Sequence, residues 1–273
     1  MKPTTASTLD GRLTDRDVKL LEDVERFRLL TTRQLQRLHF PASPLGPHVT
    51  VSSATRGTTR VLGRLEHLGA ISRLARRIGG IKHGSALTIW QLGPAGDRYL
   101  RARRGDPTRR RFEEPGLVFV DHQLAVADMA VAVLEQAEAG RFDVLELEPE
   151  PACWRAFPGT TNTALTLKPD LFVVTADKNT ETHSFVEVDR GTEHLPAVLR
   201  KCRIYQRYAD TGIEQAERGL FPAVVWIVPD AIRASKLRAA VTADKELEPD
   251  LFWILTPEQA LRHLAPYGAP IIT

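Results

Sequence analysis

The hydrophobic positions in the first third of the chain recur at the spacing of amphipathic helices. From Thr14, apolar residues return at every third position, and Thr14 is the expected N-cap. A second, short helix is expected to be capped by Thr31 or Thr32, and a third helix is expected within residues 52–71. Two β-like runs around a glycine-rich tip follow in residues 71–93. The pattern therefore predicts three helices followed by a β-hairpin.

The rest of the chain combines an apolar, alanine-rich helix with several strand-like runs. The helix is expected over residues 120–140, where neither Gly nor Pro interrupts the apolar positions before the final glycine. Strands are expected over residues 142–148, 170–176, 182–188, 221–228 and 251–256, with a helix after each of the last three. Because "PAVVWIV" is typical of a strand buried on both faces, this half is predicted to form a mixed sheet flanked by helices.

Two of these predicted strands carry acidic residues beside buried positions. Asp170 opens the run "DLFVV", Glu187 lies between two valines of the next run, and Asp189 follows it in "VEVDRG". A buried carboxylate costs free energy unless a basic side chain, a metal ion or solvent meets it. The simpler interpretations are a Pro-Asp turn for Asp170 and a loop cap with Gly191 for Asp189. A hairpin would bring Asp170 and Glu187 together.

Charge divides the chain into two unequal halves. Residues 1–112 carry 22 Lys and Arg against 9 Asp and Glu, whereas residues 113–273 carry 15 against 25. This asymmetry predicts two domains, 1–112 and 113–273, with a seam in the basic, Gly- and Pro-containing stretch 101–116. The first domain is suited to a polyanion. With two cysteines, no long apolar run and a polar beginning, the composition favours a reducing cytoplasm and no membrane partner.

The stretch "VLGRLEHLGAISRL" resembles the passage from recognition helix to wing in bacterial winged-helix regulators. The resemblance implies a winged helix-turn-helix whose third helix lies in the major groove of double-stranded DNA and whose wing grips the backbone. The alternatives are that the arginines only solvate a surface, or that the domain pairs with protein. The side chains expected to contact DNA are Arg56, Thr58, Thr59, Arg60 and Arg64 on the helix and Arg73, Arg76, Arg77 and Lys82 in the wing.

The order of elements in the second half, with "KPD" and "VEVD", resembles the PD-(D/E)xK restriction-endonuclease-like fold. The resemblance implies that Asp170 and Glu187 hold Mg²⁺ or Mn²⁺ when the site is catalytic, because hard oxygen ligands suit these ions. The motif places a lysine where this chain has Asp189. Either Lys201 on the following helix supplies the amine, or Asp189 is a third metal ligand. Lys201, Tyr205 and Tyr208 are spaced to share one face of that helix.

Five further side chains are weaker candidates. His122 lies near the start of the 120–140 helix, where the resemblance described below also has a histidine, although a structural hydrogen bond is the simpler role. Glu146 and Glu148 alternate with leucines, so they are expected on one sheet face, either as additional ligands or as solvated acids. A tyrosine nucleophile, Tyr205 or Tyr208, is the least favoured alternative because the chain lacks the histidine-rich metal spacing that accompanies it.

Taken together, the winged helix, "DHQLAVADM", "KPDLFVV" and "SFVEVDRGTE" followed by "LRKCRIYQRY" are similar to the replication-relaxation family over residues 14–256. That family comprises bacterial proteins of plasmids and mobile elements and is related to relaxases of one class of conjugative plasmids. The resemblance implies binding at a replication or transfer origin, with a magnesium-dependent nickase or relaxase-like nuclease as the leading function.

The sequence leaves two alternatives to the nuclease function. One is a non-catalytic origin-binding protein or transcriptional regulator on a degenerate nuclease fold. The other is an assembly factor whose acidic domain docks another replication or conjugation protein. A homodimer is also compatible with the sequence. Metal binding by the acidic pair discriminates the first alternative from the nuclease.

Overall fold

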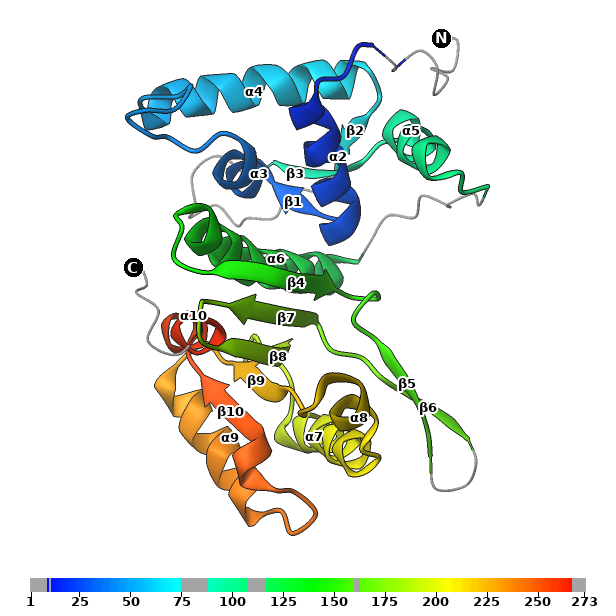
Figure 1. Cartoon of the computed structure of the whole chain (residues 1–273), viewed down its shortest axis with the longest axis vertical. Helices are drawn as coiled ribbons and strands as arrows, with labels where there is room; N and C mark the ends of the chain where they lie inside the picture. The colour runs from blue at the N-terminus through cyan, green and yellow to red at the C-terminus, as the bar shows by residue number, and fades with distance from the viewer. Residues whose placement is uncertain (1–8, 10, 75–87, 108–115, 160–162, 267–273) are drawn as a thin grey trace. The chain divides into compact units, whose positions relative to one another are not determined.

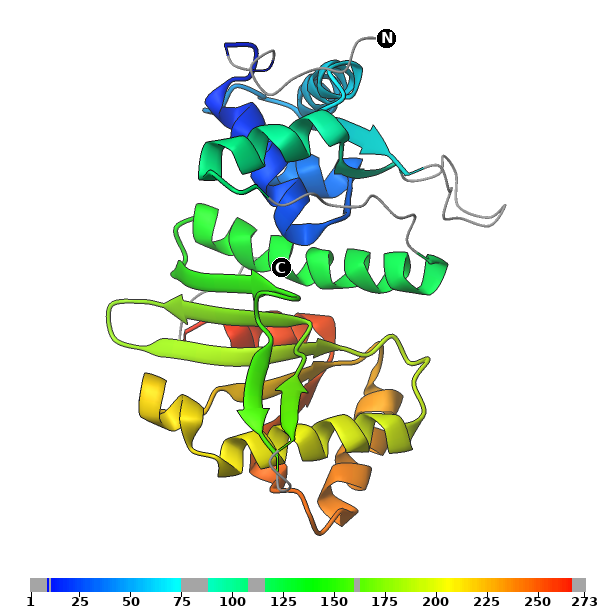
Figure 2. The same ribbon diagram turned by 90° about the vertical axis from the view of Figure 1, so that its right-hand side faces the viewer.

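The protein is described here by a computed structural model covering residue 9 and residues 11–74, 88–107, 116–159 and 163–266. The chain divides into two compact units, residues 1–131 and 132–273. Figure 1 labels their elements, and Figures 1 and 2 colour them along the chain. Both units mix helices with strands, which confirms the predicted α/β class.

The first unit contains the predicted helices and paired strands. Its elements are α2 (Asp15–Phe27), β1 (Leu30–Thr31), α3 (Thr32–His39), α4 (Val51–His67), β2 (Ile71–Arg73), β3 (Ile89–Leu92) and α5 (Pro94–Arg104). Thr14 caps α2 and Thr31 caps α3, each in a capping box that satisfies backbone N–H groups at the helix start. The strands form an antiparallel sheet in the order β1-β3-β2, so β2 and β3 pair as predicted.

Helix α5 corrects the sequence interpretation of residues 101–104 as part of a linker. The helix begins with Pro94 in its first turn and ends at Gly105, which adopts the left-handed conformation that terminates helices. It is held by its buried Tyr99 and Leu100. The basic side chains of its last turn masked this pattern in the sequence.

The second unit is built on a five-stranded mixed sheet. Its elements are the end of α6 (Leu117–Glu138), β4 (Asp143–Pro149), β5 (Arg155–Pro158), β6 (Ala164–Leu167), β7 (Leu171–Ala176), β8 (Glu181–Val188), α7 (Leu195–Asp210), α8 (Ile213–Arg218), β9 (Ala223–Ile227), α9 (Ala231–Ala243), a 3-10 turn (Pro249–Leu251), β10 (Phe252–Leu255) and α10 (Pro257–Leu264). The strand order is β10-β9-β8-β7-β4. Strands β4, β7 and β8 are antiparallel neighbours, whereas β8, β9 and β10 run parallel.

Helix α6 contributes to both units, since the division at residue 131 falls inside it. Val120 near its start packs with Leu29, Leu74 and Ile89 of the first unit. The seam predicted from charge, between residues 112 and 113, lies outside the described residues. The apolar face of the first half of α6 thus belongs with the basic half of the chain.

Both faces of the second sheet are covered, as the apolar strands predicted. All six residues of β7 are buried. On one face, Phe172 and Phe185 pack with side chains of α7 and α9, and their ring centroids lie 5.1 Å apart. On the other, the Thr175 hydroxyl donates a hydrogen bond to the Leu264 carbonyl of α10 at 2.6 Å. The sheet, packed on both faces, positions the residues at the ends of β7 and β8.

Three features of this unit were not predicted. Strands β5 and β6 form a separate two-stranded hairpin whose four-residue strands are too short to give a periodic signal. Helix α8 lies between two left-handed glycines. Helix α7 begins at Leu195 with His194 as its N-cap, two residues after Thr192, the polar residue that the sequence favours as a cap. Pro196 in the first turn favours that start.

Candidate functional site

Asp170 and Glu187 are brought together by the antiparallel pairing of β7 with β8. Leu171 pairs with Val186, and continuing this antiparallel register by one residue sets Asp170 opposite Glu187. The Asp170 N–H donates to the Val186 carbonyl at 3.1 Å, and the Val188 N–H donates to Asp170 Oδ2 at 2.8 Å. Both side chains are buried, and Glu187 is only 1% exposed. The two strands thus hold a pair of carboxyl groups below the surface.

Lys201 of α7 supplies the cation that meets this pair. Its ammonium contacts Glu187 Oε2 and lies 3.8 Å from Asp170 Oδ1. The other Glu187 oxygen, Oε1, accepts a hydrogen bond from the Tyr205 hydroxyl at 2.5 Å. Lys201 and Tyr205 are four residues apart on one helix face, as the sequence spacing predicted. The Lys201 side chain is 29% exposed, so the cluster meets solvent at the lysine.

Burial and the neighbouring charges shift the pKa values of this cluster in opposite directions. Burial raises the pKa of the Glu187 carboxyl to about 8, although the Lys201 ammonium and the Tyr205 hydroxyl act to lower it. Burial acts to lower the pKa of Lys201, but the carboxylates of Glu187 and Asp170 outweigh it and raise that pKa. Burial also raises the pKa of Tyr205 well above its usual value, so its hydroxyl keeps its proton as a donor. The lysine therefore stays charged beside the two carboxyl groups.

Asp189 has different partners. Its Oδ2 accepts a hydrogen bond from Arg233 Nε at 2.6 Å, and its Oδ1 accepts from the Gly191 N–H at 2.7 Å. The same guanidinium donates from Nη2 to the Glu193 carbonyl at 2.7 Å, which ties the loop after β8 to α9. Within the described ranges, no three His, Cys, Asp or Glu side chains gather as a metal-ligand set. The structure therefore does not group Asp189 with Asp170 and Glu187.

Glu146 and Glu148 lie in a second charged cluster. Arg218 donates to both oxygens of Glu146, at 2.9 and 3.1 Å, and Arg155 lies 3.6 Å from Glu148. Both arginines also meet the buried Glu214, at 3.0 and 3.1 Å. This network joins β4, β5 and α8, so the two strand glutamates serve to hold elements together.

Tyr208, also on α7, is a member of that second cluster. Its buried hydroxyl donates to Glu214 Oε1 at 2.9 Å, and its ring centroid lies 5.1 Å from that of Phe157. Burial and the bond to Glu214 raise its pKa. Tyr205 and Tyr208 therefore point to different carboxylates, and neither is presented as a nucleophile.

Tyr208→Phe is expected to lower the free energy of unfolding by about 1–2 kcal/mol, because Glu214 loses one donor while buried. The effect is modest because Arg155 and Arg218 remain as partners of that carboxylate. Urea unfolding of the variant and the wild type at pH 7 measures it. The ring packing is unchanged in phenylalanine, so an unaltered stability would show that the hydroxyl contributes nothing net.

The candidate DNA contacts in the described part of the first unit differ in whether they already bind an acidic side chain. Arg56, Thr59 and Arg60 are exposed on α4. Arg64 instead donates from Nη2 to both carboxylate oxygens of the buried Asp17, at 2.6 Å each, and Arg73 lies 2.9 Å from Glu66. Of the α4 residues that the sequence predicts to contact DNA, one is not accessible.

That exception is Thr58, which is fully buried and donates its hydroxyl to the Ala54 carbonyl at 2.8 Å. Arg76, Arg77 and Lys82 lie outside the described residues. His122 lies in α6 within the first unit. The structure thus leaves Arg56, Thr59 and Arg60 as the open part of the candidate nucleic-acid surface.

Sequence reasoning missed Arg233 entirely. It lies 44 residues from Asp189, in a helix without a distinctive motif, and only the tertiary fold brings the two together. Cys153 was also missed: its thiol donates to the carbonyl of Pro169, next to Asp170, at 3.0 Å, and burial raises its pKa to about 12. Neither contact has a local signal in the sequence.

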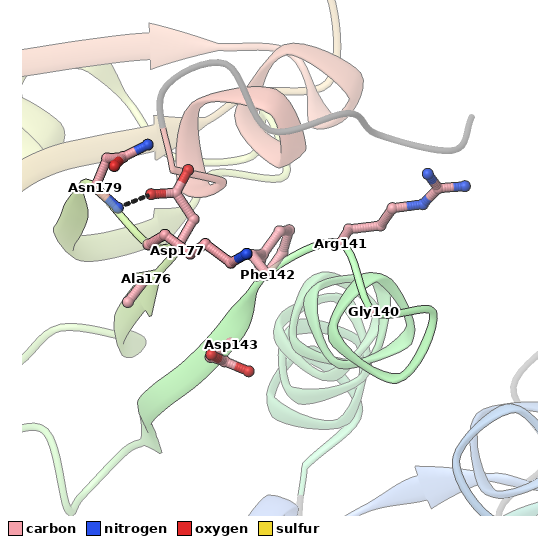
Figure 3. A pocket seen from close by; sticks show the side chains of 8 residues that line it. Gly140, Arg141, Phe142, Asp143, Ala176, Asp177 and Asn179 are labelled. Atoms are coloured by element: carbon pink, nitrogen blue, oxygen red, sulfur yellow. Dashed lines mark hydrogen bonds between the residues drawn. The ribbon is translucent and has the colours of Figure 1, made fainter.

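A pocket of about 370 Å³ lies at the other end of β7 from Asp170. It is lined by the turn after α6, residues 140–143, and by residues 176–179 between β7 and β8. Figure 3 shows the Asn179 N–H donating to Asp177 within this turn, while Arg141 points away from both. The pocket shares no residue with the Asp170–Glu187–Lys201 cluster and is not a candidate active site.

Comparison with known proteins gives one match. The model of the replication-relaxation family matches residues 21–224, which include α4 of the first unit and the Asp170–Glu187–Lys201 cluster of the second. No curated protein and no solved structure matches the chain. In the part of the chain that the structure describes, no helix has the length and apolar character needed to cross a membrane. The family match extends over most of the chain, and the protein belongs to the replication-relaxation family.

Proposed function

We propose that this protein binds DNA at an origin of plasmid or mobile-element replication or transfer, and that its second unit nicks the bound DNA with a divalent metal ion. The observation that carries the proposal is the convergence of Asp170, Glu187 and Lys201. Two carboxylates and an amine at the end of a strand pair are the functional groups of PD-(D/E)xK nucleases. The family match supports the role in replication.

The topology around the cluster supports a PD-(D/E)xK-like arrangement. Three antiparallel strands, β4, β7 and β8, are followed by α7 and then by β9 running parallel to β8. In that arrangement the lysine is expected two residues after Glu187, where Asp189 instead bonds to Arg233. Lys201 reaches the same carboxylates from α7, which compensates for the missing lysine on the strand.

The donor set fits Mg²⁺ or Mn²⁺. Asp170 Oδ1 and Glu187 Oε2 both face the Lys201 ammonium, so a single cation position already lies between them. Asp170 and Glu187 would hold the ion through carboxylate oxygens, the ligands these ions prefer. When bound, the ion activates water and stabilises charge on the scissile phosphate.

The chain's own residues have complementary tasks in this proposal. Tyr205 fixes one oxygen of Glu187, which leaves the other directed toward Lys201 and Asp170. Lys201, at the solvent-facing side of the cluster, offsets negative charge on an approaching phosphate and orients water beside it. The exposed arginines of α4 supply sequence-independent attraction to the DNA backbone.

The second candidate function is a non-catalytic origin-binding protein or regulator. The observation that favours it is that the Lys201 ammonium itself contacts Glu187 where a metal would bind. A permanently paired lysine would keep the carboxylates neutralised and exclude the ion. Metal binding and nicking distinguish the two functions.

The experiment that tests the proposal is nicking of a supercoiled plasmid carrying the cognate replicon. The full chain with Mg²⁺ or Mn²⁺ is expected to convert it to the open circular form, and EDTA to prevent this. Asp170→Asn and Glu187→Gln are expected to reduce the rate by more than about 100-fold, since loss of a ligand exceeds the effect of an outer-shell change.

Asp177→Asn is the matched control, because this aspartate lies just past the far end of β7 and bonds only within its turn in the contacts seen here. Nicking that survives both site substitutions would come from a contaminant. DNA binding without nicking by the wild type on cognate DNA would replace the nuclease with the regulator.

A further inference from the structure

An exposed apolar edge adjoins the start of α4. It consists of Leu45, which is 100% exposed, Val49 at 65% and Val51 at 69%. All three fall within the loop 41–50 and the first residue of α4. Isolated exposed apolar residues are common, but here three lie within seven positions of the chain, and each is left largely uncovered by the described residues.

The loop that carries this edge is held by specific contacts. The Ser43 N–H donates to the His48 carbonyl at 2.9 Å, and the Gly46 N–H donates to the Ser43 carbonyl at 3.0 Å. Three prolines, at positions 41, 44 and 47, restrict its backbone further. Leu45 is therefore presented by a closed, hydrogen-bonded turn.

His48 attaches this turn to α4. A Cβ atom on Gly57 would lie 2.6 Å from His48 Cε1, so the imidazole packs directly on the helix backbone at a glycine. The His48 and Phe40 ring centroids lie 5.8 Å apart. The loop that carries Leu45 and Val49 is therefore attached to α4, the helix whose exposed side chains include Arg56 and Arg60.

The charge of the segment that contains the apolar edge indicates which kind of partner binds there. Residues 26–65 contain no Asp or Glu but seven arginines. A partner that binds along α4 meets its exposed arginines, Arg56 and Arg60, and no acid from this segment. The complementary surface is a polyanion with exposed methyl groups, and duplex DNA offers both, because thymine presents its C5-methyl group in the major groove.

We infer that Leu45, Val49 and Val51 read thymine methyl groups in the DNA site. The inference rests on the proposed DNA binding and specifies which chemical group the first unit recognises. A recognition helix contacts base edges with its N-terminal residues, and Val51 is the first residue of α4. Apolar side chains at that position distinguish thymine from cytosine by the methyl group alone, with no hydrogen bond required.

The test compares DNA that differs only in this methyl group. A site is selected from random duplex DNA with the full chain, then synthesised with either thymine or deoxyuridine at every T. The wild type is expected to bind the deoxyuridine duplex about fourfold more weakly for each contacted methyl removed. Leu45→Ala/Val51→Ala is expected to bind the thymine duplex more weakly and to lose the discrimination.

Ile232→Ala is the matched control, since this exposed apolar residue lies on α9 in the other unit. It is expected to discriminate between the duplexes as the wild type does. Equal binding of both duplexes by the wild type would overturn this inference and leave DNA binding intact. No binding of any duplex would instead overturn the proposed function.

The oligomeric state provides one more decisive outcome. Sedimentation of the wild type and the Leu45→Ala/Val51→Ala variant is expected to give the same mass. If the variant changed its mass while retaining discrimination between thymine and deoxyuridine, the edge would be a contact between protein copies and the inference would be wrong.

Discussion

Lys201→Met is expected to lower the free energy of unfolding by about 3–5 kcal/mol at pH 9 in metal-free buffer. The substitution keeps most of the side-chain volume but removes the ammonium that contacts Glu187 Oε2. Glu187 would then be a buried anion without its cation or would have to bind a proton, with the Tyr205 hydroxyl as its remaining side-chain donor. Removing one partner of a buried pair is costly because the other charge is left uncompensated.

The substitution is expected to lower the free energy of unfolding less at pH 6 than at pH 9. The direction of this pH dependence follows from the pKa of Glu187. That pKa is raised in the folded protein from 4.5 to about 8, so the folded state binds the proton more tightly than the unfolded state. The stabilisation this provides is fully present below about pH 4.5 and is lost as pH rises through 8. Without Lys201 the folded pKa rises further, so the variant continues to lose stability above the pH at which the wild type levels off.

Urea unfolding at pH 6 and pH 9 measures this difference. Arg200→Met removes an exposed cation from the neighbouring position of α7 and is expected to change stability little at either pH. Adding Glu187→Gln to Lys201→Met is expected to restore part of the loss, because position 187 then carries no buried charge and only Asp170 has lost its cation. Equal stability of Lys201→Met and wild type at pH 9 would contradict the proposed pairing.

The same variant separates catalysis from binding. Under the proposed function, Lys201→Met is expected to abolish plasmid nicking while DNA affinity stays within about twofold of the wild type, since the DNA-binding arginines lie on α4. If nicking survived at pH 7, the lysine would be a structural counter-ion. The pH 6 stability measurement shows whether enough folded variant is present to judge this.

The sequence pattern predicted the strands and the helix face that carry this site, but it did not predict the contacts between distant elements. The alternation in "SFVEV" and the Pro-Asp before "LFVV" predicted neighbouring strands, and β7–β8 pairing brings Asp170 beside Glu187. The four-residue spacing of Lys201 and Tyr205 predicted their common face, and both contact Glu187. These properties depend on the geometry of single strands and helices, which short sequence windows determine.

Contacts between distant elements were not predictable in this way. Asp189 has the same chemistry as Asp170, and only the position of α9 gives it Arg233 as a partner. Thr58 looked like its polar neighbours, but its place on the inner face of α4 turns its hydroxyl to the helix's own backbone. Arg64 was counted as a DNA contact because the sequence could not show the buried Asp17 beside it.

The exposed arginines of α4 and the paired Arg64 are expected to differ in their effect on DNA affinity. Arg56→Ala/Arg60→Ala is expected to weaken binding about 100-fold near physiological salt, because two charge-assisted contacts are removed. Both side chains are exposed, and Arg56 bonds only to the Ser52 hydroxyl of its own helix among the contacts seen here. Fluorescence anisotropy between 50 and 200 mM salt is expected to show a slope of log affinity against log salt reduced by about 2.

Arg64→Ala is the matched control, because it removes a third arginine from the same helix. Although burial acts to raise the pKa of Asp17, Arg64 and Thr14 hold it below its usual value, so the Arg64 guanidinium is committed to a buried carboxylate. Its loss is expected to lower stability and to leave the salt slope nearly unchanged. If Arg64→Ala reduced the slope as much as either exposed arginine, the DNA surface would extend to the C-terminal half of α4. An unchanged slope in the double variant would remove α4 from the interface.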